Sequence, residues 1–194
     1  MVDLCGAPGS WSQVCRKILG EKGFFTAEDK VEGFRIVSVD LQDTAPIDNV
    51  HHITGDITKM ETMHKILDAF QGLFIKNLGN LCELVISDGA PDITGFHDMD
   101  QYIQSQLLVA ALNIATKLLK KGGNFVAKIF KGSEHGLLYS QFKYYFSEIH
   151  IVKPDSSRES SVEHFLVGLN FHGGEEGMEK IELSTFGKQE EKYE

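Results

Sequence analysis

The sequence predicts an α/β fold, a mostly parallel sheet covered by helices on both faces. Strongly apolar segments of strand composition alternate with amphipathic segments along the 194-residue chain, which is the pattern of such a sheet. The chain opens with a predicted strand, a glycine-containing loop and a helix, the layout of a nucleotide-type ligand site. Several apolar segments also end in aspartate, at the sheet edge where these folds bind ligands.

The expected strands are short apolar runs, and the expected helices carry apolar residues three and four positions apart. Only a short link, Lys153 to Ser161, separates the last two expected strands. They could therefore pair as a hairpin and add an antiparallel strand to the sheet. We expect strands near 2–5, 34–40, 50–54, 83–88, 123–130, 148–153 and 163–170, and helices near 10–20, 58–70, 100–120 and 136–147.

Two of the helices have a clear apolar face. Gly122 and Gly123 follow the longer one and are expected to end it, because glycine favours helix C-termini. The expected apolar positions are Trp11, Val14, Cys15, Ile18 and Leu19 in the first helix, and Ile103, Leu107, Ala111, Ile114 and Leu118 in the third.

Residues 1–171 are expected to form one domain, which is long enough for a full core. The segments 21–33 and 73–81 have mixed composition and are expected to be loops. The tail, 172–194, is acidic and is expected to be flexible. Its seven Glu and three Lys contribute −4 to the net charge of −9. An acidic protein does not attract nucleic acid through its overall field, so any RNA site must be a local basic patch.

The cysteines and the first residues indicate in which cellular compartment the protein is expected. Cys5, Cys15 and Cys82 have no paired spacing, which favours reduced thiols and a reducing compartment such as the cytoplasm. No C-x-x-C or H-x-x-x-H pair indicates zinc. No apolar run reaches membrane-spanning length, and the residues after Met1 predict a strand rather than a signal peptide.

The loop after the first strand contains Gly6, Pro8 and Gly9, in Gly-x-x-Gly spacing. This spacing differs from the G-x-G-x-x-G of dinucleotide sites, so it disfavours an NAD-dependent oxidoreductase. Pro8 stiffens the loop, and Trp11 offers a flat apolar face beside it. The combination suits a small ligand with an adenine and a polar tail. Core packing is an equally good interpretation of Trp11, since it starts the apolar face of the helix.

Acidic residues lie at the ends of the first four expected strands: Asp3, Asp40, Asp56 and Asp88. Any one of them could simply cap a helix or face solvent, but a series at one sheet edge favours a ligand site. Asp40 stands where an acid would accept hydrogen bonds from a ribose diol. Asp56 could accept one from an adenine amino group, and Asp88 is expected nearer the reacting end.

Four segments together resemble the motifs of the FtsJ/RrmJ-like RNA 2′-O-ribose methyltransferases. The first contains the glycine loop, the second follows the fourth strand, and the third is a strand with an internal lysine. The resemblance covers roughly residues 1–170. The segments are Asp3–Gln13, Ser87–Asp92, Phe125–Phe130, and Lys153–Arg158 followed by Ser160–Glu163.

Within that family the chain looks most similar to the eukaryotic branch that methylates tRNA anticodon loops, including the wobble nucleotide. The resemblance implies a class I (Rossmann-like) fold whose seven-stranded sheet has an antiparallel last strand. It also implies S-adenosylmethionine as methyl donor, no metal, and an accessory repeat-protein subunit. Ribosomal RNA or mRNA caps are alternative substrates, and an inactive S-adenosylmethionine-binding module is an alternative function. The branch resemblance lies in Asp40–Gln42, Asp92–Asp98, Gln106–Thr116 and Leu138–Gln141.

The family uses a Lys-Asp-Lys-Glu tetrad, and the resemblance assigns Asp88, Lys128 and Glu163 to its last three positions. The first lysine lies on a helix before the glycine loop, and this sequence begins at the loop, so we expect exposed apolar surface there. Lys128 could act as a base or as an electrostatic stabiliser. The alternatives are a snorkelling lysine and, for Glu163, a solvated strand residue.

Candidate RNA contacts surround the expected cleft, although each is individually more typical of ordinary solvated charge. His97 follows the second motif and could also touch RNA. RNA recognition would depend on shape, the 2′-OH and a splayed loop base. The basic candidates are Arg16, Lys17, Lys131, Lys153 and Arg158.

Overall fold

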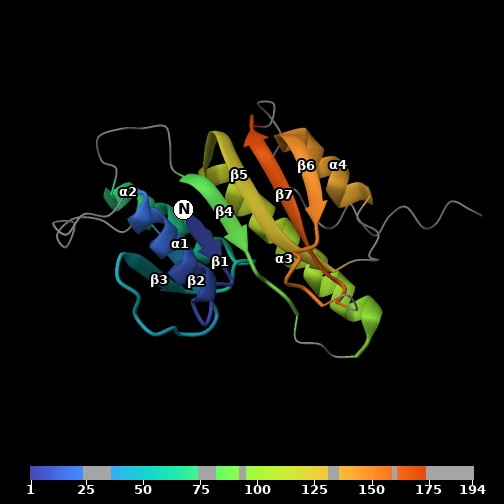
Figure 1. Ribbon diagram of the computed structural model, residues 1–194, viewed down its shortest axis with the longest axis horizontal. Helices are drawn as coiled ribbons and strands as arrows, with labels where there is room; N and C mark the ends of the chain where they lie inside the picture. The colour runs from blue at the N-terminus through green and yellow to red at the C-terminus, as the bar shows by residue number, and fades with distance from the viewer. Residues whose placement is uncertain (24–35, 74–81, 92–94, 131–135, 159–160, 174–194) are drawn as a thin grey trace, which may run out of the picture.

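A computed structural model describes residues 1–23, 36–73, 82–91, 95–130, 136–158 and 161–173 of the chain (Figure 1). Its centre is a seven-stranded sheet of order β3-β2-β1-β4-β5-β7-β6. The strands from β1 to β5 pair in parallel, and β7 runs antiparallel to both β5 and β6. The predicted mixed sheet and its C-terminal hairpin are therefore confirmed. The strands are β1 (Val2–Leu4), β2 (Ile36–Asp40), β3 (Val50–Thr54), β4 (Cys82–Ser87), β5 (Leu119–Phe130), β6 (Phe146–Val152) and β7 (Glu163–Phe171).

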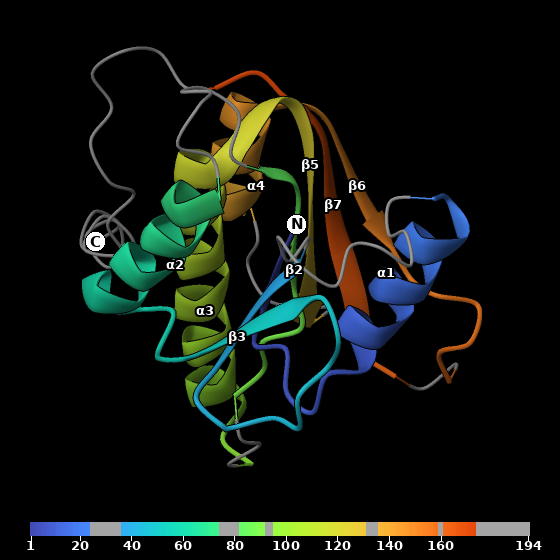
Figure 2. The ribbon, with the colours of Figure 1, turned by 90° about the vertical axis from the view of Figure 1, so that its left-hand side faces the viewer.

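Helices cover both faces of the sheet, as predicted, but unequally. Figure 2 shows α2 (Met60–Leu73), α3 (His97–Leu118) and α4 (Gly136–Tyr145) on one face and α1 (Ser10–Glu21) on the other. The buried apolar cluster draws on the sheet and on the three helices of the first face. Within it the ring of Phe142 packs 5.3 Å from that of Phe125 and 6.3 Å from that of Phe146, between ring centroids. The main core therefore lies between the sheet and α2, α3 and α4.

The predicted apolar face of α1 is only partly buried. Val14 is 58% exposed and Ile18 is 45% exposed, whereas Ser12 is fully buried. The buried apolar cluster contains no residue of α1. The prediction that the apolar stripe marks the buried side of this helix is therefore wrong for Val14 and Ile18.

The predicted end of the third helix is also wrong. Helix α3 stops at Leu118, and β5 begins at the next residue, so Gly122 and Gly123 lie inside a strand. Gly122 has a φ of 80°, which a glycine adopts without steric cost. The β4–β5 register shifts beside it, between Cys82 and Leu84. The glycines therefore shape an irregularity in the strand and do not end the helix.

Other expectations fall outside the described residues. They are most of the loop predicted at 21–33, nearly all of that at 73–81, and the tail from 174 onward. None of the described helices combines the length and the apolar composition needed to cross a bilayer.

Candidate active site

The strongest candidate for a reactive group is the ion pair of Lys128 and Asp88. The Nζ atom of Lys128, in β5, lies 2.9 Å from Oδ1 of Asp88, directly after β4. The Lys128 side chain is 13% exposed and that of Asp88 36%. Burying an ammonium to this extent costs free energy unless a counter-charge pairs with it, and here the Asp88 carboxylate is that counter-charge. The Lys128 ammonium is therefore fixed in place by an ion pair and largely buried. A snorkelling lysine would instead extend its ammonium into solvent, so this interpretation is disfavoured.

The glycine loop has the tight geometry that its sequence predicts. The Gly6 N–H donates to the carbonyl of Val39 at 3.1 Å, and a Cβ on Gly6 would lie 2.5 Å from Oγ of Ser38. Gly9 is the N-cap of α1 with a φ of 106°, in the left-handed region that favours glycine. No side chain caps this helix start. Its first N–H groups therefore face the loop, in the arrangement that binds polar ligands.

Asp3 and Asp40 lie beside this loop. Asp3 is fully buried and accepts a hydrogen bond from Oγ of Ser12 at 2.6 Å. Burial is the main cause that raises the pKa of Asp3 to about 6. The hydrogen bonds from Ser12 act to lower this pKa, and the charges of Asp88 and Asp40 act to raise it. The Asp40 carboxylate accepts from the N–H groups of Ala7 and Gln42, each at 2.9 Å. It thus ties the end of β2 to the glycine loop.

The Cys5 thiol, directly before the glycine loop, is also affected by these charges. Burial is the main cause that raises the pKa of its thiol to about 12; the carboxylates of Asp40, Asp3 and Asp88 also act to raise this pKa, and the Lys128 charge acts to lower it. Asp3, Asp40, Asp88 and Lys128 lie at or next to the ends of β1, β2, β4 and β5, on the side of the sheet where the sequence places the strand-end acids. Asp56 forms no hydrogen bond or ion pair with them in the described part of the chain, and a shared ligand site stays a prediction.

Asp56 has a local structural role. Its Oδ1 accepts hydrogen bonds from the N–H of Thr58 at 2.9 Å and from its hydroxyl at 2.7 Å. Partial burial acts to raise the pKa of Asp56, but the Thr58 bonds and the charge of Lys59 outweigh it and lower the pKa. Asp56 thus shapes the turn before α2. Its expected contact with an adenine amino group stays a prediction.

Trp11 and Glu163 lie on the Lys128 side of the sheet. The ring of Trp11 packs against Phe165 with centroids 5.5 Å apart, and Phe165 stands opposite Lys128 in the β5–β7 ladder. Trp11 therefore packs α1 onto the sheet next to the lysine. Glu163 stands opposite Phe130, which places it diagonally from Lys128 at about 7–8 Å between backbones. In the described part of the chain, the ion pair of Lys128 is with Asp88 rather than Glu163.

The candidate RNA contacts are scattered. Arg16 donates to the carbonyl of Asp48 at 2.8 Å and pairs with its carboxylate, and Lys17 pairs with Glu21. These two fit the interpretation as ordinary surface charge. Arg158 is exposed and Lys153 is half-buried, both between β6 and β7. Lys131, Asp92 and the His97 side chain lie outside what the structure describes.

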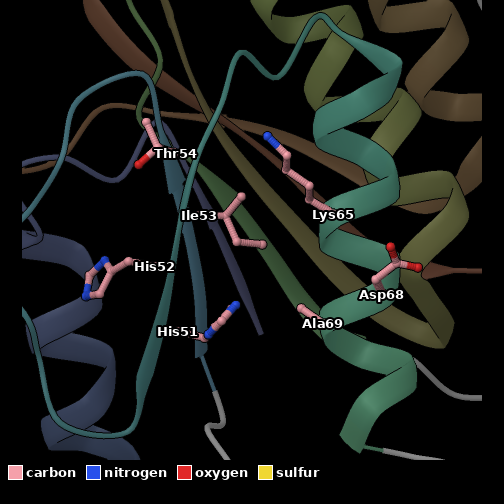
Figure 3. Close-up of a pocket in the computed structure, with 7 residues that line it drawn as sticks. All are labelled: His51, His52, Ile53, Thr54, Lys65, Asp68 and Ala69. Atoms are coloured by element: carbon pink, nitrogen blue, oxygen red, sulfur yellow. The ribbon is translucent and has the colours of Figure 1, made fainter.

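A cavity of about 480 Å³ lies elsewhere, between β3 and α2 (Figure 3). None of the predicted site residues lines it. Among the described residues, no three His, Cys, Asp or Glu side chains are grouped to hold a metal ion. The cavity is lined by His51, His52, Ile53, Thr54, Lys65, Asp68 and Ala69.

Ser12, Phe165 and Cys5, whose φ is 57°, lie beside the predicted site residues but were not expected there from the sequence. Ser12 carried a usable signal, because it is a polar residue one turn into a helix that follows a strand-end acid. Phe165 and Cys5 gave none, since their importance depends on which strands become neighbours.

Known methyltransferases are similar to this chain in sequence. The family model described as FtsJ-like methyltransferase matches residues 1–171. The tRNA (cytidine(32)/guanosine(34)-2′-O)-methyltransferases of Mus musculus and Schizosaccharomyces pombe are each 50% identical to this chain. The match covers 86% of this chain and 46% of the Mus musculus protein, and 89% of this chain and 58% of the Schizosaccharomyces pombe protein. The Ribosomal RNA large subunit methyltransferase E of Methanocaldococcus jannaschii is 38% identical, over 89% of this chain and 65% of that protein. The chain spans about half the length of the tRNA methyltransferases it matches.

Solved structures share the fold. A protein described as a ribosomal RNA methyltransferase from Plasmodium falciparum superposes with a TM-score of 0.70 at 25% identity, covering 89% of this chain and 86% of that one. Human Methyltransferase-like protein 13, in complex with SAH, has a TM-score of 0.54 at 12% identity over 95% and 75% of the two chains. The predicted class I fold is confirmed. On its sequence, its sheet and its motifs, this chain belongs to the FtsJ-like methyltransferase family.

Proposed function

We propose that this chain transfers a methyl group to a ribose 2′-OH of tRNA, in the anticodon loop including the wobble nucleotide. The observation that carries the proposal is the largely buried Lys128 ammonium, 2.9 Å from Asp88, whose backbone N–H donates to the carbonyl of Leu4 just before the glycine loop. The curated relatives at 50% identity are named for 2′-O-methylation of tRNA nucleotides 32 and 34. Residues 1–171 would form the catalytic domain, acting in the cytoplasm with an accessory repeat-protein subunit.

S-adenosylmethionine is the proposed methyl donor, without a metal. The donor set fits this ligand, because carboxylates suit a cation and the loop admits a ligand close to the backbone. The buried Oδ1 of Asp3 has no hydrogen-bond partner among the described residues, so an acceptor atom is left over beside the loop. When bound, S-adenosylmethionine supplies an electrophilic methyl group on a sulfonium. We propose that Gly9, Trp11, Asp40, Asp56 and Asp88 hold it.

The chain's own contribution is to orient the 2′-OH and manage its proton. The ion pair with Asp88 fixes the Lys128 ammonium at the end of β5. From there the Lys128 ammonium can donate an N–H to the ribose oxygen and stabilise the negative charge that develops there, while the hydroxyl proton passes to solvent water. In its neutral form it would instead accept that proton as a base. We propose that Glu163, diagonal to Lys128 on β7, positions the ribose or the lysine.

The test combines binding and transfer. Isothermal calorimetry of the wild-type chain with S-adenosylhomocysteine and with NAD is followed by methylation of a tRNA transcript and of a ribosomal RNA fragment. We expect S-adenosylhomocysteine binding, no NAD binding, and transfer to the tRNA. Binding without transfer to either RNA would favour a binding module. Transfer to the ribosomal RNA alone would favour the function named for the 38% identical relative.

A further inference from the structure

We propose that Gln104, on α3, is a positioning residue that holds Lys128 and Asp88 at their working distance. Its side-chain amide links the backbone of Lys128 to the backbone that follows Asp88. The inference rests on the proposed function, because it assigns Gln104 a part in the same methyl transfer.

The contacts of Gln104 are two hydrogen bonds to main-chain carbonyls. Its Nε2 donates to the carbonyl of Lys128 at 2.7 Å and to that of Gly89 at 3.2 Å. An amide nitrogen has two hydrogens, one for each carbonyl, so both donors are used. The residue is 3% exposed, and water therefore does not readily replace these bonds.

The place of these bonds in the sheet explains why a side chain is needed there. The β4–β5 ladder ends at the pair of Ser87 and Ala127, so the Lys128 carbonyl lies just beyond the last strand-to-strand pair. β4 ends at Ser87, and Asp88 and Gly89 follow it in a loop. Gln104 donates across the gap where the two strands part. It thereby fixes the separation of the two backbones that carry the 2.9 Å ion pair.

The rest of the Gln104 side chain contributes little polar bonding. Its Oε1 is buried and has no hydrogen-bond partner in the described part of the chain. The proposed role therefore depends on the two donors alone. Methionine has nearly the same length and no donor, so Gln104→Met removes the link and keeps the volume.

The experiment compares the wild-type chain, Gln104→Met and the control Gln141→Met. Gln141, on α4, also has a buried Oε1 without a partner among the described residues, so the control makes the same chemical change on a different helix. Three quantities are measured: the Kd for S-adenosylhomocysteine, the kcat and KM for tRNA methylation, and the rate at which a trace acylating reagent labels Lys128. The labelling rate of Lys17, whose side chain is 77% exposed, is the internal reference.

We expect Gln104→Met to lower kcat about 10²-fold, as small displacements of reacting groups do. The Kd and KM should change little, labelling of Lys128 relative to Lys17 should rise severalfold, and Gln141→Met should behave as wild type. If Gln104→Met does not fold, Gln104→Asn withdraws the amide by one methylene and should give the same pattern.

Unchanged kcat and unchanged Lys128 labelling in the Gln104 variant would overturn the proposal. So would an equal rise at Lys17 and Lys128, which reports general loosening. If the wild-type chain methylates no RNA, the proposed function fails. The relative labelling of Lys128 then still decides whether Gln104 holds the ion pair.

Discussion

Asp3 makes stability depend on pH in a direction opposite to most carboxylates. Its pKa rises from 3.8 in the unfolded reference to about 6 in the folded protein, chiefly because it is buried. Between these two values the folded state binds more protons than the unfolded state, so stability falls as pH rises. The full cost, about 3 kcal/mol, is present above pH 6 and absent below the unfolded pKa.

Asp3→Asn removes this titration and keeps an oxygen that can accept the Ser12 hydroxyl, now 2.6 Å from Asp3. The assay is urea unfolding of wild type and variant between pH 5 and pH 8. We expect the stability of the variant relative to wild type to increase with pH, by about half of the 3 kcal/mol over this range. A constant difference in stability between the two proteins leaves the expected pH dependence unchanged, because a fixed cost or gain from the amide does not vary with pH. A difference in stability that stays the same at every pH would refute the reasoning.

Three further variants test other parts of the structure. Gly9→Ala should destabilise the protein by about 1–2 kcal/mol and weaken S-adenosylhomocysteine binding, because φ at Gly9 is 106° and the new Cβ would lie 2.8 Å from Cδ1 of Ile47. Thermal unfolding measures the loss of stability and calorimetry the loss of binding; wild-type values in both would contradict this prediction. Phe142→Ala should cost about 3–5 kcal/mol by denaturant unfolding, since the ring is fully buried against Phe125 and Phe146; a loss below 1 kcal/mol would contradict that packing. Asp88→Asn should lower tRNA methylation at least about 10²-fold while the protein stays folded by circular dichroism; undiminished turnover would remove Asp88 from the mechanism.

The positions of the strands, and the end of the sheet at which Asp40, Asp88 and Lys128 lie, could be predicted from the sequence, because both depend on local pattern. Apolar runs locate the strands, and parallel strands bring their C-terminal residues to one edge, so Asp40 and Asp88 could be expected near Lys128. The family motifs then supplied the expected roles.

What failed depends on neighbours that a local pattern does not contain. Val14 and Ile18 have helical spacing, but little packs over that side of α1. Gly122 carries the same left-handed conformation that ends helices, yet the chain uses it inside β5. The two bonds of Gln104 join positions 15 and 24 residues away, and only the assembled sheet shows that they meet.

The central claim is that Lys128 acts on a ribose hydroxyl beside the glycine loop. The most direct measurement incubates a tRNA transcript with isotope-labelled S-adenosylmethionine and either wild type or Lys128→Ala, then locates the label by nuclease digestion and mass spectrometry. We predict a 2′-O-methyl group at an anticodon-loop nucleotide with wild type, and its loss with Lys128→Ala at unchanged S-adenosylhomocysteine affinity. Label on a base, or equal ribose methylation by the variant, would contradict the account.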